Sequence, residues 1–295
     1  MKIVAIGEIL WDVFPDGERL GGAPLNFAAH AARLGHEVIL VSAVGDDPRG
    51  YQALREMKRL GLTTDWIRTV FDMPTGEVTV RLDEAGQPHF TIHRPAAYDR
   101  VALDQGTLGR LAAARPDWIA FGTLHQMEET VRAATRAIFE ACGSARRFYD
   151  VNLRPGSYTP ELVKELLAAA DAVKLSEAEA AEVAAMAGLE SGSPEAFCAA
   201  GAERFGWKAA CVTRGAAGSV VWIEGRAAEA QGYRVEVADA VGAGDAYAAA
   251  FLHGLEAGWP AAQVADFANR VGALVASRPG AIPKWSLEEL EQLGR

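Results

Sequence analysis

Short apolar runs alternate with longer helical segments along most of this chain. Buried-strand patterns occur at KIVAIG (2–7), EVILVSAVG (37–45), DWIAFG (117–122), RRFYDVN (146–152), DAVKLS (171–176) and KAACVT (208–213). Helical segments lie between them, for example APLNFAAHAARLG (23–35) and YQALREMKRLG (51–61), each closed by a glycine. Such alternation predicts an α/β fold with a mostly parallel sheet that helices cover on both faces. No repeat or Pro-rich linker divides the 295 residues.

Residues 76–95, GEVTVRLDEAGQPHFTIHRP, break this pattern because they alternate with period two around an EAGQP turn. They predict an antiparallel hairpin with one apolar face (Val78, Val80, Leu82, Phe90, Ile92) and one polar face (Arg81, His89, His93). A half-buried hairpin beside an α/β sheet is a candidate lid over a site. The alternative is an edge extension without a catalytic role.

Charge and cysteine content limit the classes of partner and compartment. The formal net charge is −10 and the pI is near 5.2, which argues against nucleic acid or an anionic membrane as the main partner. The three cysteines, Cys142, Cys198 and Cys211, are far apart, as expected for buried thiols in a reducing cytosol. No apolar run approaches the roughly 20 residues of a membrane span, and the N-terminus does not resemble a signal peptide. We expect a cytoplasmic protein.

The stretch DAVGAGDAYAAAFLHGL (239–255) carries a candidate for catalysis. Gly242 and Gly244 permit a tight turn, and a strongly helical composition begins at Ala243. Unpaired N–H groups at a helix N-terminus attract an anion, and Asp245 lies in that first turn as a candidate general base. This arrangement suits phosphoryl transfer to a hydroxyl. The alternative is structural, since Asp is common in the first turn of helices.

Two motifs together resemble a known family. DAVGAGD resembles the C-terminal motif of PfkB-type carbohydrate kinases, which have the ribokinase-like fold, and GGAPLNFAAHAARLG (21–35) resembles their N-terminal motif. The resemblance extends from GEILWD (7–12) to GAIP (280–283) and is strongest to bacterial fructokinases. It implies one three-layer αβα domain over 1–295, with a small β lid inserted at about 68–98 and possible participation of 10–22.

The resemblance also implies the residues that act on the sugar. Asp245 would activate the sugar hydroxyl, beside an anion hole formed by Gly242, Ala243 and Gly244. Asp12 would bind sugar hydroxyls, because one carboxylate accepts hydrogen bonds from two neighbouring OH groups. Gly22 and Asn26 would complete the sugar floor, although Asn26 could instead cap the helix that follows it.

The nucleotide side follows from the same resemblance, with ATP as cofactor. Thr213, Gly215 and Gly218 belong to the loop TRGAAG, and Asn269 would line the adenine pocket unless it is a surface residue. Ser176 replaces the Asn of the family's Asn-x-x-Glu motif, which leaves its phosphate contact in doubt. The implied ion and phosphate ligands are Glu179 for Mg²⁺ through water, Asp239 for a monovalent cation such as K⁺, and Arg154 for phosphate charge.

Other site motifs do not match. GAERFGWK (201–208) has no Ser or Thr after its lysine, so a Walker A loop is not expected. GAGDAY lacks the GxGxxG pattern and lies near the C-terminus, which disfavours a nicotinamide oxidoreductase. His89 and His93 share a strand face but have no evident third metal ligand.

The predicted reaction is ATP-dependent phosphorylation of D-fructose to fructose 6-phosphate. Kinases acting on ribose, a nucleoside or a sugar acid such as 2-keto-3-deoxygluconate remain alternatives, and Arg94 in the lid could bind a sugar-acid carboxylate. A non-catalytic sugar-binding regulator is an alternative of another class. A homodimer through the lid is a further possibility. We also expect the helix N-terminus to keep Asp245 ionised without a raised pKa.

Overall fold

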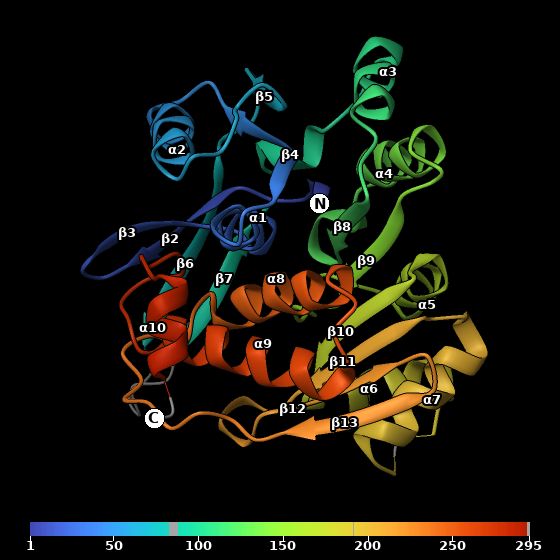
Figure 1. Ribbon diagram of the computed structural model, residues 1–295. Helices are drawn as coiled ribbons and strands as arrows, with labels where there is room; N and C mark the ends of the chain where they lie inside the picture. The colour runs from blue at the N-terminus through green and yellow to red at the C-terminus, as the bar shows by residue number, and fades with distance from the viewer. Residues whose placement is uncertain (83–87, 191, 294–295) are drawn as a thin grey trace.

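The computed structural model describes residues 1–82, 88–190 and 192–293. Its main feature is a nine-stranded sheet in the order β13-β12-β11-β10-β9-β8-β1-β4-β5 (Figure 1). The strands are β1 (Lys2–Ile6), β4 (Glu37–Gly45), β5 (Ile67–Val70), β8 (Trp118–Gly122), β9 (Arg146–Asp150), β10 (Ala172–Ser176), β11 (Ala209–Thr213), β12 (Ser219–Ile223) and β13 (Arg226–Ala230). Neighbouring strands from β5 to β11 pair in parallel, and β12 and β13 continue the sheet antiparallel.

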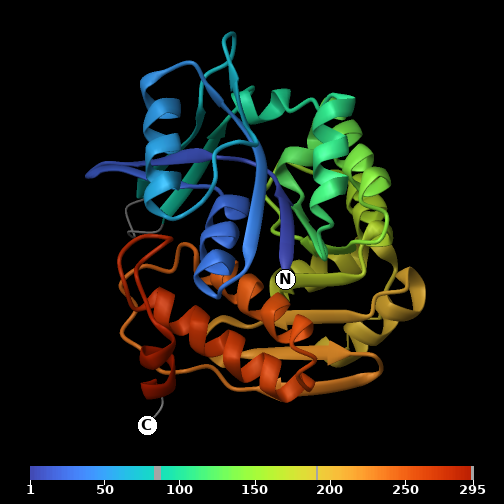
Figure 2. The same ribbon diagram turned by 45° about the horizontal axis from the view of Figure 1, so that its top comes forward.

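Helices cover both faces of this sheet. One layer consists of α1 (Ala23–Arg33), α2 (Pro48–Arg59), α8 (Ala243–Glu256) and α9 (Ala261–Ala276), with α10 (Leu287–Gln292) beside it. The other consists of α3 (Gln105–Ala114), α4 (Glu129–Ala141), α5 (Pro160–Ala169), α6 (Glu177–Ala187) and α7 (Pro194–Phe205). In Figures 1 and 2, α3 and α4 lie together on one side of β1, and α1 lies on the other. The predicted three-layer α/β architecture is confirmed.

The sequence explains these layers because alternate residues of each buried strand face different helices. On β9, Phe148 packs with the α1 and α8 layer, whereas Tyr149 packs with the α4 and α5 layer. The predicted cysteine burial is also confirmed, since all three thiols are free and buried. Among the described residues, no helix is both long enough and apolar enough to cross a membrane.

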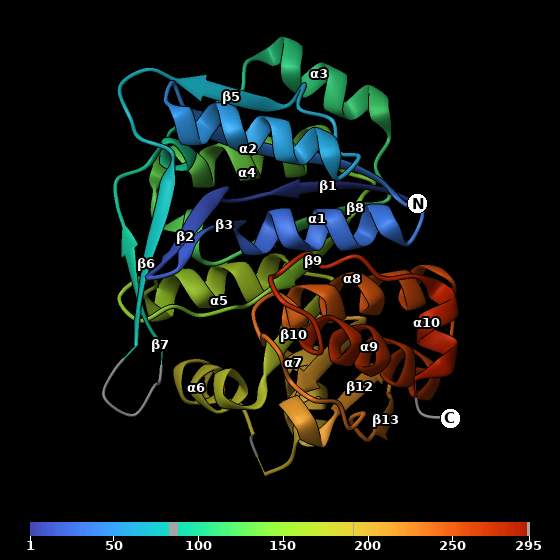
Figure 3. The same ribbon diagram turned by 90° about the vertical axis from the view of Figure 1, so that its left-hand side faces the viewer.

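A second sheet of four strands lies beyond the carboxyl end of β1, at one side of the molecule (Figure 3). Its order is β3-β2-β6-β7, with β2 (Leu10–Phe14), β3 (Gly17–Gly21), β6 (Gly76–Leu82) and β7 (Pro88–His93). The hairpin strands β6 and β7 are therefore paired as expected, and segment 10–21 joins them. The predicted lid range of about 68–98 begins too early. Its first residues belong to β5, which pairs with β4 in the large sheet.

The two strands of the hairpin differ in how far their apolar side chains are buried. Val78 and Val80 are buried, while Phe90 is half exposed, so the apolar face is only partly covered. Most of the predicted turn and the side chain of His89 lie outside the described residues. His93 contacts Thr79, with Nε2 2.8 Å from the threonine Oγ1.

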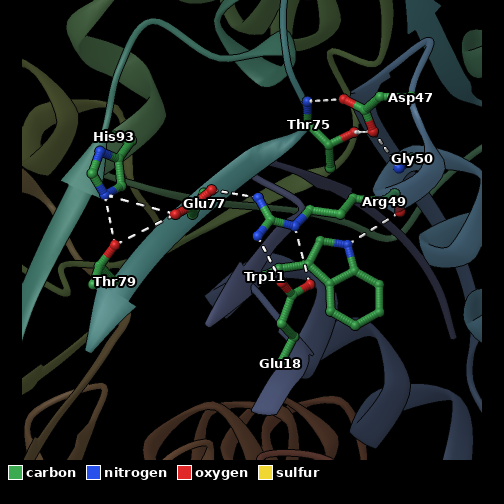
Figure 4. Close-up of polar contacts among 9 residues, drawn as sticks. All are labelled: Trp11, Glu18, Asp47, Arg49, Gly50, Thr75, Glu77, Thr79 and His93. Carbon is green, nitrogen blue, oxygen red and sulfur yellow. Dashed lines mark hydrogen bonds and ion pairs between the residues drawn. The ribbon is translucent and has the colours of Figure 1, made fainter. Parts of the chain in front are cut away.

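Asp47 and Arg49, at the start of α2, form polar contacts with the second sheet and with the segment that leads into it (Figure 4). Asp47 caps α2 through the amide N–H of Gly50 at 2.7 Å, and it also accepts hydrogen bonds from the backbone N–H and hydroxyl of Thr75. Arg49 donates two hydrogen bonds to Glu18 on β3, at 3.0 and 2.7 Å, and another to Glu77 on β6. One guanidinium thus joins two strands of the second sheet to one helix.

We predict that Arg49→Met loosens the second sheet without unfolding the protein. Partly exposed ion pairs are worth up to about 1 kcal/mol, which corresponds to about fivefold faster opening. Amide hydrogen exchange in β3 and β6 should therefore accelerate while Tm changes little. Arg59→Met is the matched control, because it removes an exposed pair with Glu56 on the same helix. Unchanged exchange in Arg49→Met would show that other contacts hold the sheet.

Candidate active site

A cavity of about 880 Å³ lies between the second sheet and the carboxyl ends of the central strands. This edge is where open α/β sheets bind their ligands. The polar and charged side chains that line it are Glu8, Asp12, Asn26, Thr91, Arg94, Thr123, Asp150, Asn152, Arg154, Ser157, Lys174 and Asp245. Gly22, Gly242 and Gly244 line it as well. The cavity therefore collects residues from both ends of the chain.

The helix α8 points its N-terminus into this cavity. Its N-cap is Gly242 with φ +81°, and a Cβ there would lie 2.3 Å from the carbonyl oxygen of Ala281, so only glycine fits. Helical first turns leave N–H groups without intrahelical acceptors, as an anion hole requires. Ala243 N–H lies 3.4 Å from the Ala240 carbonyl oxygen, and Ala243 does not line the cavity.

Asp245 on α8 contacts Asn26 on α1. The Asn26 Nδ2 donates a hydrogen bond of 2.8 Å to Asp245 Oδ2. Burial raises the pKa of Asp245, although the charge of Lys174, the Asn26 hydrogen bond and the charge of Arg154 oppose this effect. The prediction of an unraised pKa was therefore wrong, because the helix N-terminus lies in a pocket that removes water from the carboxylate.

The expected sugar-side residues lie together on β2 and α1. Burial raises the pKa of Asp12 to about 6, against the lowering influence of Arg154. Gly22 caps α1 with φ +110°, and a Cβ there would lie 2.5 Å from the Glu8 carbonyl oxygen. Because Gly22 is the cap, the alternative capping role for Asn26 was wrong. Within the described part of the chain, the buried Asn26 Oδ1 has no hydrogen-bond partner, which leaves it able to accept one.

Arg94 lines the cavity but is held by the protein itself. Its Nε and Nη2 donate to Asp99 at 3.2 and 2.6 Å, and its Nη1 donates to the Leu124 carbonyl oxygen at 3.0 Å. A second carboxylate, that of Glu128, lies 3.5 Å from Nη2. The positive charge of Arg94 is therefore largely neutralised within the chain.

The residues expected on the nucleotide side do not line the cavity. Ser176 and Thr213 are register neighbours at the ends of β10 and β11, and Gly215 and Gly218 follow in the next turn. Asn269 on α9 is buried and donates to the carbonyl oxygens of Ala230 and Gln231, so it is not a surface residue.

The expected ion ligands both hold backbone groups. Glu179 forms a capping box with Ser176 at the start of α6, and its Oε1 accepts a 2.7 Å hydrogen bond from Leu153 N–H. Asp239 accepts from Val241 N–H at 3.0 Å and from Gly280 N–H at 3.1 Å. Among the described residues, no group of three or more His, Cys, Asp or Glu side chains could hold a metal ion.

Comparison with known proteins identifies the family. The family model described as pfkB family carbohydrate kinase matches residues 9–287, nearly the whole chain. The chain belongs to the pfkB family of carbohydrate kinases. The family resemblance drawn from the two sequence motifs is thereby confirmed.

Individual relatives agree with this assignment. A fructokinase from Klebsiella pneumoniae is 33% identical over 300 residues, covering 95% of each chain. The crystal structure of the uncharacterized sugar kinase PH1459 from Pyrococcus horikoshii in complex with ATP has a TM-score of 0.83 at 26% identity, covering 99% of this chain and 98% of that chain. A 2-dehydro-3-deoxygluconokinase from Thermotoga maritima has a TM-score of 0.86 at 20% identity, covering 99% and 98%, which shows the shared fold alone.

Sequence reasoning missed three charged residues of this pfkB-family kinase, namely Glu8, Asp150 and Lys174. Each lies in or next to an apolar strand and lines the cavity. Burial raises the pKa of Glu8 to about 7 and that of Asp150 to about 6. A charged residue inside an otherwise apolar strand pattern was the available signal, because burying an unpaired charge is costly.

We predict that Glu8→Gln stabilises the ligand-free kinase increasingly as the pH rises. The pKa of Glu8 is raised in the folded protein from 4.5 to about 7, so its ionisation destabilises the fold across that window. The difference in unfolding free energy between variant and wild type should grow to on the order of 3 kcal/mol above pH 7. Gln retains an acceptor for the Ala23 N–H.

Melting curves or denaturant titrations at pH 4.5, 6 and 8 measure this difference. Glu203→Gln, on the exposed surface of α7, is the control and should show no such trend. A Glu8→Gln difference that stays constant with pH would contradict a raised Glu8 pKa.

Proposed function

We propose that this kinase transfers the γ-phosphoryl group of ATP to a hydroxyl of D-fructose, giving fructose 6-phosphate. The observation that carries the proposal is the hydrogen bond between Asn26 and Asp245. It joins the family's two motifs, and thereby brings a carboxylate at a helix N-terminus to the floor of a polar cavity. A group that accepts a proton and a group that stabilises phosphoryl charge then lie side by side.

In this mechanism Asp245 accepts the proton of the attacking sugar hydroxyl. The hydroxyl oxygen forms a bond to the γ-phosphorus as the bond from that phosphorus to the bridging oxygen breaks, and ADP leaves. The first turn of α8, which lines the cavity at Gly242 and Gly244, stabilises the charge on the transferred group. Arg154 is exposed at the cavity and adds positive charge near the phosphates.

The polar groups on the sugar side favour a neutral polyol. Asp12 and the free Asn26 Oδ1 are hydrogen-bond acceptors for hydroxyl groups, and Gly22 allows close approach. Because Arg94 is already bound to Asp99, it offers little charge for a substrate carboxylate. This favours fructose over a sugar acid such as 2-keto-3-deoxygluconate, in agreement with the Klebsiella pneumoniae relative named fructokinase.

The nucleotide would lie along the ends of β10 and β11, against Thr213, Gly215, Gly218 and Asn269. The Pyrococcus horikoshii sugar kinase, which was solved in complex with ATP, supports the choice of nucleotide. Mg²⁺ would neutralise phosphate charge, held mainly by water and phosphate oxygens, which suits a site without a cluster of three protein ligands in the described residues. Glu179 would contact this ion through water.

Two further roles follow from the family resemblance. Asp239 would help to hold a monovalent cation next to the anion-hole loop, where it already accepts two backbone N–H groups. The second sheet would close over bound sugar and exclude water, which would otherwise accept the phosphoryl group. The same sheet would also be the contact of a homodimer.

The test is ADP formation from Mg-ATP with a panel of fructose, ribose, a nucleoside and 2-keto-3-deoxygluconate. We expect fructose to give the highest kcat/KM. Asp245→Asn should lower kcat by about 10²- to 10⁴-fold, the usual contribution of a positioned general base, while ATP binding changes little and the protein remains folded. Sugar binding without ADP formation would instead indicate a non-catalytic regulator, and a variant that keeps most of its turnover would exclude Asp245 as the base.

We further predict that Asp12→Ala raises KM for the sugar far more than KM for ATP. The hydroxyl pair loses a charged acceptor, and such hydrogen bonds are worth about 1.5–3 kcal/mol, or about 10- to 150-fold in affinity. Initial rates with each substrate varied in turn measure both constants. Equal changes in the two KM values would place Asp12 outside the sugar site.

A further inference from the structure

A buried ion pair lies beneath the N-terminus of α8. Lys174 on β10 and Asp150 on β9 are direct register neighbours of the parallel sheet. The lysine Nζ lies 3.0 and 3.2 Å from the two carboxylate oxygens of Asp150. Among the described residues, Lys174 is the only lysine or arginine that is buried. A buried ammonium group is costly, so its position calls for a physical explanation.

The lysine reaches beyond its partner on β9. A Cβ built on Gly244 would lie 3.4 Å from Lys174 Nζ, so the ammonium group lies next to the residue that precedes Asp245. Lys174 also lines the active-site cavity. The two hydrogen bonds to Asp150 leave the third N–H of the ammonium group to point elsewhere, since a protonated lysine has three donors.

The charge of this part of the cavity is otherwise acidic. The other ionisable groups that interact with Asp245 are Glu8, Asp12 and Asp150, all carboxylic acids, and Arg154, which is exposed. Each carboxylate makes the ionised state of the others less favourable in a partly dry pocket. Within the part of the chain that the structure describes, Lys174 is the single buried lysine or arginine that offsets this repulsion, and Glu179 interacts with its charge as well.

We propose that Lys174 is a positioning residue for phosphoryl transfer, which keeps Asp245 in the ionised state that accepts the proton. The inference rests on the proposed role of Asp245 as the base. In this view Asp150, at the end of β9, holds the lysine side chain in place and partly neutralises its charge. The balance between the two residues then sets the pH range in which the kinase works.

The test is the acid limb of the pH profile of kcat/KM for the sugar, measured for wild type and four variants. Lys174→Met removes the cation, so the limb should move up by one pH unit or more, and activity should recover toward the wild-type value at high pH. Asp150→Asn removes a competing negative charge, so the limb should move down. Lys208→Met, at an exposed lysine, should leave the limb unchanged. Opposite shifts from two members of one ion pair are not expected from damage to the fold.

The double variant Asp150→Asn/Lys174→Met covers the case in which Lys174→Met does not fold, because it leaves no unpaired buried charge at the two positions. The acid limb of its pH profile should lie at a higher pH than that of Asp150→Asn. The proposal is overturned if Lys174→Met and Asp150→Asn shift the limb in the same direction or not at all, or if the double variant matches Asp150→Asn. If one of those outcomes occurs and the Asp245→Asn variant is inactive, only the role of Lys174 is rejected. If the Asp245→Asn variant is active, the proposed function itself is rejected.

Discussion

The hydrogen bond from Asn26 to Asp245 is the contact on which the rest of the site depends. The two residues are 219 positions apart, and each lies near the N-terminus of a helix, α1 and α8. These helices pack against each other on one face of the sheet, so their N-termini meet at the carboxyl ends of the strands. Two glycine caps, Gly22 and Gly242, allow the chain to enter both helices at this close spacing. A parallel sheet therefore brings the proposed sugar floor and the proposed anion hole together without any sequence proximity.

The same geometry creates an electrostatic difficulty that the chain resolves internally. Burial of these carboxylates in one cavity makes each of them harder to ionise, and their mutual repulsion adds to that effect, so the pKa values of Glu8, Asp12 and Asp150 are raised to about 7, 6 and 6. Such a cluster is ready to bind hydroxyl groups, which can donate to ionised oxygens, but it repels an incoming polyphosphate. Positive charge at Lys174 and Arg154 opposes that repulsion, and the N-terminal end of the α8 dipole is expected to act in the same sense.

Features that depend on local pattern were predictable from the sequence. Contacts that depend on how distant strands pair were not. Buried strands, the first two helices and the hairpin were predictable from periodicity and glycines, and the motifs around Asn26 and Asp245 indicated the family. The ion pair of Lys174 and Asp150 was not predictable, because it depends on the register of β9 against β10. The raised pKa of Asp245 was missed for a related reason, since burial raises it while Lys174, Asn26 and Arg154 oppose that effect, and only the fold brings these distant residues to Asp245.

One helix fixes the two halves of the site relative to each other. Besides Asn26, α1 carries His30, whose Nδ1 accepts a 3.1 Å hydrogen bond from Trp285 Nε1. That bond leaves Nε2 as the donor to the carbonyl oxygen of Ala281 at 3.0 Å, and burial lowers the pKa of His30 to about 4, so the neutral ring persists at physiological pH. The backbone of Ala281 is the surface against which Gly242 packs. Because α1 contacts Asp245 through Asn26, and through His30 contacts the Ala281 backbone beside Gly242, this one helix links the proposed base to the proposed anion-hole turn.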